Sequence, residues 1–343
     1  MASRPTVHDV AREAGVSLAT VDRVLNARSG VRPATARKVE EAMAKLRYER
    51  DIAAANLSKN RFYRFCFILP KGPNTFMRGL EQEVGKIAER GPLDRIEIET
   101  IMVPAFDGVA LAEVLDTVGH QEFDGIAVVA TESQAVHQAI EGLRNRDIHV
   151  VTLVSDHPTS QRDHFIGIDN EVAGRTAAGL LGRFCHASSG KIAVIAGSML
   201  LRDHMERRNG FERIIRDEYP HFSILPAIEG LDNSDRVELL LREMLEQNSD
   251  IVALYSLGAG NRGVIRALET TGKAGTIPVV AHELTEHTRT ALQNGIFDAV
   301  INQDPGHEAR SAVRVLKALV DGRPFLNAQE RIRIDIFMRD NLP

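Results

Sequence analysis

A short stretch near the N-terminus carries side chains that suit the binding of nucleic acid. Thr20, Arg23 and Asn26 can donate hydrogen bonds to phosphates and base edges. Leu18 and Ala19 can contact the methyl groups of thymine. We expect all five on the exposed face of one helix, so that the helix could present them to a groove. The DNA-binding residues expected in this stretch are Thr6, Ser17, Leu18, Ala19, Thr20, Asp22, Arg23 and Asn26.

Two short helices are predicted to position these side chains. Thr6 is placed to cap the first helix, and Gly15 supplies the conformation that ends it and turns the chain. Ser17 is placed to cap the second helix. Such a pair forms a helix-turn-helix, whose second helix can enter a major groove. A helical hairpin that packs without touching DNA is the alternative, and the polar exposed face of the second helix argues against it.

The segment Thr6–Asn26 resembles the headpiece of the lactose-repressor (LacI/GalR) family. The family pattern D-V-A-x-x-A-G-V-S-x-x-T-V-x-R-V-L-N is nearly intact here. Asp22 departs from it, because serine is common at that position in the family. A carboxylate facing DNA is repelled by phosphate unless it accepts from a cytosine amine or pairs with Arg23. The departure therefore bears on which operator sequence is recognised.

A third helix and a hinge are expected after this motif. Pro33 opens a helix that runs to about Leu46, which gives a headpiece of residues 1–48. Residues 49–61 form a helical pattern that is too short and polar to fold alone, so a plain linker is one reading. In the family, this position resembles a hinge helix that folds only on DNA. Leu57 would then be the apolar wedge that enters the minor groove.

Charge is distributed unevenly along the 343 residues, a length that suggests two or three domains. Residues 1–64 contain 13 Lys and Arg against 7 Asp and Glu, whereas the remainder contains 29 against 40. A basic end on an acidic body suits a DNA-binding head whose partner domain is not drawn onto phosphates.

Cysteine usage and hydropathy indicate the compartment. Cys66 and Cys185 lie in apolar surroundings without a partner spacing, so we predict two buried free thiols in a reducing cytoplasm. No apolar run approaches a membrane span, and the N-terminus lacks the apolar segment of a signal peptide. We therefore expect a cytoplasmic protein with no membrane partner.

The chain from Phe62 onward alternates apolar strand-like runs with helical patterns, which predicts an α/β fold with buried parallel sheets. Ten strands exceed one sheet, so two doubly wound subdomains should follow the all-α headpiece. This part resembles the periplasmic sugar-binding protein fold, in which the chain crosses between two lobes three times. The resemblance implies, within an effector-binding and dimerisation domain of residues 62–343, a first lobe of residues 62–160 and 295–322 and a second lobe of residues 161–294 and 323–343.

Polar side chains that directly follow the predicted strands are the candidates for ligand binding. Ligands in open α/β sheets bind beyond the carboxyl ends of the strands, and a cleft between two lobes collects those ends from both. Arg207 begins an R-x-x-G sequence, where the resemblance implies a sugar-binding arginine. Carboxylates, amides and one arginine match a ligand with several hydroxyl groups. The candidates are Asn74, Phe76, Glu132, Ser155, Asp156, Arg207, Asn261, His282, Glu283 and Gln303.

One departure from the family concerns the type of ligand. Many members carry an Asn-Asp pair that grips two sugar hydroxyls, and this chain has Gly258 at that place. The ending Gln303-Asp304-Pro305 resembles ribose-type binders. Both features favour a pentose, polyol or cyclitol over a common hexose.

An enzyme is the competing reading for a doubly wound fold. Gly258, Gly260 and Gly263 match G-x-G-x-x-G, but they lie far into the second lobe and the signal alone is weak. The sequence carries no phosphate loop, no G-x-S-x-G and no metal-ligand spacing of His and Cys. We therefore expect no catalytic residue, cofactor or metal.

The residues together favour a sequence-specific transcriptional regulator, expected to be a repressor controlled by a small sugar, polyol or cyclitol. No leucine heptad follows the last strand, so we expect a homodimer that binds a pseudo-palindromic operator. An effector-independent architectural DNA-binding dimer is the first alternative. A sugar-processing enzyme with a DNA-binding appendage is the second.

Overall fold

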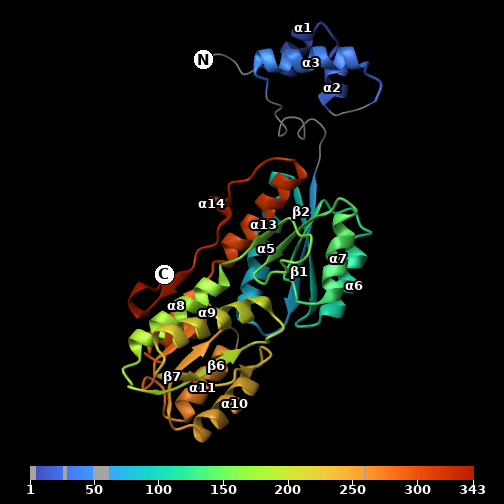
Figure 1. Ribbon diagram of the computed structural model, residues 1–343. Helices are drawn as coiled ribbons and strands as arrows, with labels where there is room; N and C mark the ends of the chain where they lie inside the picture. The colour runs from blue at the N-terminus through green and yellow to red at the C-terminus, as the bar shows by residue number, and fades with distance from the viewer. Residues whose placement is uncertain (1–4, 26–28, 49–61, 259) are drawn as a thin grey trace. The chain divides into compact units, whose positions relative to one another are not determined.

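The computed structural model describes residues 5–25, 29–48, 62–258 and 260–343. The chain divides into two compact units, Met1–Arg61 and Phe62–Pro343 (Figure 1). Asn26, Leu57 and the hinge expected over residues 49–61 lie outside the described residues.

The first unit contains the predicted helix-turn-helix. Thr6 and Asp9 form a reciprocal cap, in which the Thr6 backbone N–H donates to Asp9 Oδ2 at 2.9 Å and the Asp9 N–H donates to Thr6 Oγ1 at 3.4 Å. Gly15 ends the first helix with a φ of 65°, in the left-handed region that favours glycine. Val10, Val21 and other small apolar residues form the core. The helices are α1 Val7–Ala14, α2 Leu18–Leu25 and α3 Pro33–Leu46.

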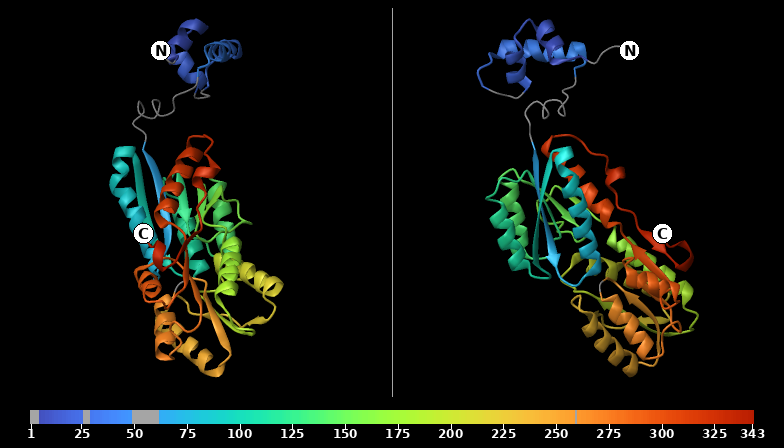
Figure 2. Two further views of the ribbon diagram at one scale, coloured as in Figure 1. Left: turned by 90° about the vertical axis from the view of Figure 1, so that its left-hand side faces the viewer. Right: turned by 180° about the vertical axis from the view of Figure 1, so that it is seen from behind.

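The second unit begins with a five-stranded parallel sheet in the order β2-β1-β3-β4-β5. Helices α5 and α13 cover one face of this sheet, and α6 and α7 cover the other (Figures 1 and 2). The strands are β1 Tyr63–Lys71, β2 Ile96–Pro104, β3 Gly125–Val128, β4 His149–Leu153 and β5 His164–Ile166. The helices are α5 Thr75–Asp94, α6 Gly108–Val118, α7 Gln134–Arg144 and α13 Pro305–Val320.

A second sheet has the order β12-β11-β10-β9-β6-β7, with β8 also paired to β6. All pairs are parallel except β11 with β12, the last strand of the chain. The strands are β6 Gly190–Ala196, β7 Phe222–Ile224, β8 Ile228–Glu229, β9 Ile251–Ser256, β10 Val279–His282, β11 Ala299–Asn302 and β12 Asp335–Phe337. The helices are α8 Asn170–Phe184, α9 Arg202–Glu218, α10 Ser234–Gln247, α11 Asn261–Thr270 and α12 Glu286–Gln293, with a 3-10 turn at Arg339–Asn341. The short helix α14 Asn327–Glu330 lies instead against α13 of the first lobe, where Arg314 Nη2 donates to Glu330 Oε2 at 2.7 Å.

The chain crosses between the two sheets later than predicted. β5 pairs with β4 in the first sheet, so the first crossing follows Ile166 and not residue 160. β11 belongs to the second sheet, so the next crossing follows Asn302 and not residue 294. Both predicted boundaries are wrong by a few residues, because an apolar run shows that a strand is buried but not which sheet it joins.

Both cysteines are buried free thiols, as predicted. Burial raises the pKa of the Cys66 thiol to about 12, and the nearby Glu99 charge adds to this effect. Such a thiol stays protonated at neutral pH and is a poor nucleophile. Within the described part of the chain, no helix is both long enough and apolar enough to cross a membrane.

Candidate functional site

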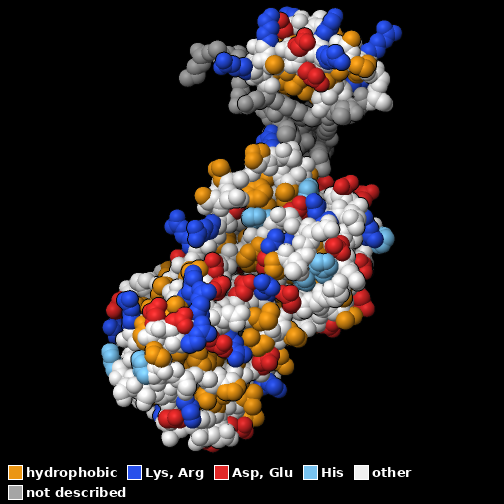
Figure 3. Space-filling view, viewed as in Figure 1, with side chains coloured by type: hydrophobic (Ala, Val, Ile, Leu, Met, Phe, Trp, Pro, Cys, Tyr) orange, Lys and Arg blue, Asp and Glu red, His pale blue; other side chains and the backbone are white. Residues whose placement is uncertain are grey.

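The face of α2 predicted to meet DNA is largely exposed. Leu18, Ala19, Asp22 and Arg23 are exposed, with Leu18 showing 42% of its surface although it is a large apolar residue. Ser17 Oγ accepts a hydrogen bond from the Thr20 backbone N–H at 3.2 Å, which caps the start of the helix. Figure 3 shows several Lys and Arg side chains on the surface of this unit. The remaining residue of the predicted set, Thr6, is exposed at the start of α1.

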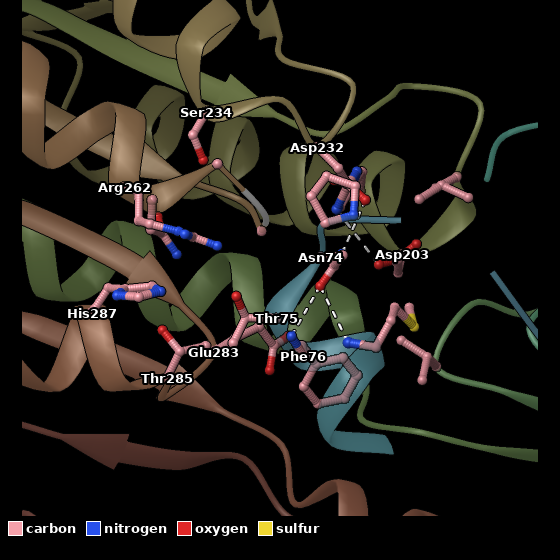
Figure 4. A pocket seen from close by; sticks show the side chains of 18 of the residues that line it. Asn74, Thr75, Phe76, Asp203, Asp232, Ser234, Arg262, Glu283, Thr285 and His287 are labelled. Carbon is pink, nitrogen blue, oxygen red and sulfur yellow. Dashed lines mark hydrogen bonds and ion pairs between the residues drawn. The ribbon is translucent and has the colours of Figure 1, made fainter. Parts of the chain in front are cut away.

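A cavity of about 60 Å³ lies between the two lobes of the second unit (Figure 4). It is formed by the loops that follow β1 and β4 in the first lobe and β6, β8, β9 and β10 in the second. The carboxyl ends of strands from both sheets therefore meet at one place, as predicted for this fold. Its polar lining includes Asn74, Thr75, Asp203, His204, Arg207, Asp232, Ser234, Asn261, Arg262, Glu283, Thr285 and His287.

Arg207 is fixed at the base of this cavity with only 1% of its surface exposed. Its Nε donates to Asn170 Oδ1 at 2.8 Å, and its Nη1 donates to the Leu257 carbonyl at 2.6 Å. Nη2 lies 3.6 Å from Glu283 Oε1 and 3.9 Å from Asp203 Oδ2, and it has no hydrogen-bond partner among the described residues. One end of the guanidinium is thus anchored and the other end is available to a ligand.

Two glycines bring α9 close enough to α8 to place Arg207 there. A Cβ at Gly210 would lie 2.1 Å from the Glu171 carbonyl oxygen. A Cβ at Gly174 would lie 1.9 Å from the carbonyl oxygen of Arg207 itself. Any side chain at either position would force the helices apart. The R-x-x-G sequence therefore sets the helix spacing as well as supplying the cation.

Glu283 forms the next wall of the cavity with Gln303 behind it. Gln303 Nε2 donates to Glu283 Oε1 at 2.9 Å, while Glu283 Oε2 and Gln303 Oε1 have no partner in the described structure. Burial raises the pKa of Glu283 to about 7, although the Arg207 charge opposes this rise. Burial thus favours the neutral form of Glu283, whereas Arg207 favours the carboxylate.

A hydrogen bond joins the two lobes across the cavity. Asn74 Nδ2, from the first lobe, donates to Asp232 Oδ2, from the second, at 3.1 Å (Figure 4). The amide oxygen of Asn74 accepts from the backbone N–H groups of Phe76 and Met77 at 3.0 and 3.3 Å, so it also caps α5. Burial raises the pKa of Asp232, while the Asn74 hydrogen bond lowers it.

Strained backbone is concentrated at this cavity. Val154, Asp232 and Glu283 line it with φ angles of 61°, 55° and 71°, and Leu231 beside it has 49°. These are left-handed conformations that cost non-glycine residues about 1–3 kcal/mol each and that cluster at ligand-binding sites. The residues with strained backbone therefore lie at the same strand ends as the polar side chains of the cavity.

Five of the ten predicted ligand residues line the cavity, and a sixth touches it indirectly. Gln303 reaches it through Glu283. The five that line it are Asn74, Phe76, Arg207, Asn261 and Glu283.

The other four predicted residues do not line it, because neighbouring residues engage or bury them. Asp156 accepts from Thr152 Oγ1 at 2.6 Å and from Arg162 Nη2 at 2.6 Å. Glu132 Oε2 lies 3.6 Å from Arg202 Nη1. The remaining two, Ser155 and His282, are buried, and His282 Nε2 is hydrogen-bonded to the Tyr255 hydroxyl at 2.8 Å.

Several residues that line the cavity were not predicted from the sequence. Asp203 and His204 lie in the first turn of α9, one helical turn before Arg207. Asp232 follows β8, a strand of two residues that is too short for a recognisable pattern. Periodicity along α9 could have found Asp203, since it lies four residues before Arg207 on the same helical face. The other missed polar residues are Thr75, Ser234, Arg262, Thr285 and His287.

Comparison with known families covers most of the chain. Residues 65–324 match the periplasmic binding protein domain, and residues 6–51 match the bacterial regulatory proteins of the lacI family. The structure is similar to GanP, a glucose-galactose binding protein from Geobacillus stearothermophilus, with a TM-score of 0.73 and 22% identity over 82% of this chain and 99% of that one. The structure is also similar to an ABC transporter solute binding protein from Burkholderia graminis C4D1M in complex with D-arabinose. The TM-score is 0.74, with 21% sequence identity over 81% of this chain and 96% of that one. The predicted fold class is therefore confirmed.

Sequence relatives match over the N-terminal part. Catabolite control protein A from Staphylococcus xylosus is 42% identical over 80 residues, which is 22% of this chain and 24% of the relative. The HTH-type transcriptional regulator pepR1 from Lactobacillus delbrueckii subsp. lactis is 37% identical over 83 residues, which is 24% of this chain and 25% of the relative. The match spans about a quarter of the length of these curated relatives. With the two family matches, it shows that the chain belongs to the lacI family of bacterial regulatory proteins and carries a periplasmic binding protein domain.

Proposed function

We propose that this protein is a cytoplasmic transcriptional regulator, acting as a homodimeric repressor, whose affinity for operator DNA is controlled by a small ligand bound between the lobes. The ligand is a sugar, polyol or cyclitol. The lacI-family headpiece and the likeness to sugar-binding proteins support this proposal. They also argue against an enzyme.

The main support for a ligand in the cavity is a set of buried polar atoms that have no hydrogen-bond partner within the described structure. Arg207 Nη2 is a free donor, and Asp203 Oδ1, Asp232 Oδ1 and Glu283 Oε2 are free acceptors within the described structure. Each such atom costs about 1–3 kcal/mol while it stays unpaired. A hydroxyl group both donates and accepts, so a polyhydroxylated ligand could satisfy all four atoms.

The DNA half of the proposal uses the exposed face of α2. Leu18 and Ala19 would read bases, whereas Arg23 would meet phosphate. A two-fold dimer would present two such helices to a pseudo-palindromic operator. Thr6, Ser17, Thr20 and Asp22 complete the proposed contact set within the described residues, and Asn26 and Leu57 belong to it outside them.

A thermal-unfolding screen with pentoses, hexoses, polyols and cyclitols tests the ligand half. A ligand at one hundred times its dissociation constant should stabilise the protein by about 2.7 kcal/mol. The shift must saturate, because non-specific stabilisation by sugars rises steadily with concentration. The ligand that shifts unfolding must also change operator affinity. If it stabilised the protein without that change, an effector-independent architectural DNA binder would be the better description.

Arg23→Ala tests the DNA half. If Arg23 meets phosphate, the variant should bind every DNA sequence more weakly, and the slope of log affinity against log salt concentration should fall by about one for each Arg23, or about two for the dimer. Fluorescence anisotropy over a salt series measures both quantities. Arg90→Ala, an exposed arginine on α5 of the other unit, is the matched control. An unchanged salt slope in Arg23→Ala would remove Arg23 from the phosphate contacts.

A further inference from the structure

A second, smaller cavity of about 30 Å³ opens beside the proposed ligand cavity. The two share four lining residues, Asn74, Met77, Leu201 and Asp232. Both members of the hydrogen bond that joins the lobes therefore stand at the junction. A ligand that filled both cavities would pass beside this hydrogen bond or replace it. We refer to the second cavity as the side chamber.

The walls of the side chamber differ chemically from those of the main cavity. Val103, Leu111 and Val129 line it with exposed fractions of 4%, 1% and 7%. Apart from the shared residues, its only polar side chains among those described are Lys71 and Thr131. Bound water would find few partners there, whereas a hydrocarbon group would be transferred from water to an apolar surface.

Phe106 adds an aromatic wall at an energetic cost to the backbone. Its φ is 63°, a left-handed conformation that is rare for a bulky residue. Asp107 follows at once and caps α6, accepting from the N–H groups of Val109 and Ala110 at 3.1 and 2.9 Å. The cap fixes the turn, and the turn keeps Phe106 in the lining of the side chamber.

The second lobe also presents apolar side chains next to this junction. Leu200 and Leu231 are 57% and 46% exposed, and they directly precede the lining residues Leu201 and Asp232 in the chain. Large apolar side chains at the edge of a cleft are typical of sites that receive an apolar group. Such groups are not needed for a ligand that carries hydroxyls alone.

We propose that the side chamber binds a short hydrocarbon substituent on the ligand, so that the effector is an alkyl-substituted sugar or polyol, such as an alkyl glycoside. This inference rests on the proposed function, since the hydroxylated part of the same molecule occupies the main cavity. The size of the chamber selects a short group. At about 30 Å³ the chamber has half the volume of the main cavity, so the substituent must be smaller than the hydroxylated part of the ligand.

Matched pairs of probes test the inference. Isothermal titration would compare free monosaccharides with their methyl, ethyl and propyl glycosides in both anomeric forms. For the ring that binds, affinity should rise by about fourfold for each carbon that enters the chamber and then stop rising. A free sugar that binds as tightly as all its glycosides overturns the inference and leaves the proposed function standing. If neither free nor substituted molecules bind, the proposed function fails as well.

The variant Phe106→Asn tests whether the gain in affinity on alkylation arises in the side chamber. Asparagine tolerates a left-handed backbone, so the variant should fold while one apolar wall is lost. The variant should bind the free sugar as wild type does and lose most of the gain from alkylation. Leu93→Asn, at an exposed position on α5 outside both cavities, is the control and should keep that gain. A full gain retained in Phe106→Asn would overturn the assignment.

Discussion

Arg207→Ala is expected to lower the free energy of unfolding by about 3–5 kcal/mol, the usual result of breaking a buried ion pair by removing one partner. The substitution leaves Glu283 and Asp203 buried without their cation and removes the hydrogen bonds to Asn170 and the Leu257 carbonyl. It should also abolish stabilisation by the ligand. From the sequence we would expect Arg207 to bind the ligand and its removal to spare the fold, but its 1% exposure contradicts the second expectation.

Urea unfolding at neutral pH, with and without ligand, measures both effects. Arg213→Ala is the matched control on the same helix, because Arg213 pairs with Glu171 at 2.7 Å at a site where both side chains are more than 40% exposed. Exposed pairs contribute about 0–1 kcal/mol, so this variant should unfold almost as wild type does. A loss in Arg207→Ala no larger than that of Arg213→Ala would mean that the guanidinium is not the buried counter-charge described above.

Glu308→Gln should flatten the pH dependence of stability. Glu308 lies in the first turn of α13 with 0% exposure, and neither carboxyl oxygen has a partner among the described residues. Burial, followed by the negative charge of Glu283, raises the pKa of Glu308 well above its usual value, while Arg207 opposes the rise. Asp304 and Asp203 also act on it, and both raise the pKa.

The direction of the effect follows from proton binding. A raised pKa means that the folded protein keeps the proton over a pH range in which the unfolded chain, with a pKa near 4.5, releases it. Stability from Glu308 is therefore full below about pH 4.5 and is lost as the pH rises. The loss is about 1.4 kcal/mol per pH unit while the folded carboxyl stays protonated. Glu283 contributes in the same direction up to its pKa of about 7.

Unfolding free energies measured from pH 5 to pH 8 test this prediction. The glutamine variant should lose less stability over this range than the wild type, since an amide does not titrate. Glu89→Gln, at an exposed position on α5, removes a carboxylate from the surface and should leave the slope unchanged. Parallel curves for wild type and Glu308→Gln would contradict a protonated buried Glu308.

Sequence reasoning succeeded where structure is determined locally. The Thr6 cap and the Gly15 turn need only neighbouring residues, so the helix-turn-helix is readable from spacing. The alternation of strands and helices, with the rule that ligands bind at strand ends, likewise led to Asn74 and Glu283, whereas the resemblance to the family implied Arg207.

It failed where the conformation of a loop or the pairing of a very short strand decides the outcome. Asp156 follows a strand as the rule requires, yet Arg162 occupies its carboxylate. Asp232 lines the cavity although the two-residue strand before it gives no periodic signal. Neither outcome can be read from spacing. The first depends on how the loop after β4 folds, and the second depends on the pairing of a strand of only two residues.

The single amide of Asn74 has a kinetic consequence. Its oxygen holds the start of α5 while its nitrogen holds Asp232 on the opposite lobe, so one side chain ties the two lobes together across the cavity. For a ligand that enters after this bond breaks and the lobes separate, opening of the cleft precedes binding. The observed rate of association should then level off at high ligand concentration, at the rate at which the lobes open. Responses to a sudden change in ligand supply would be timed by the protein's own opening and not by diffusion.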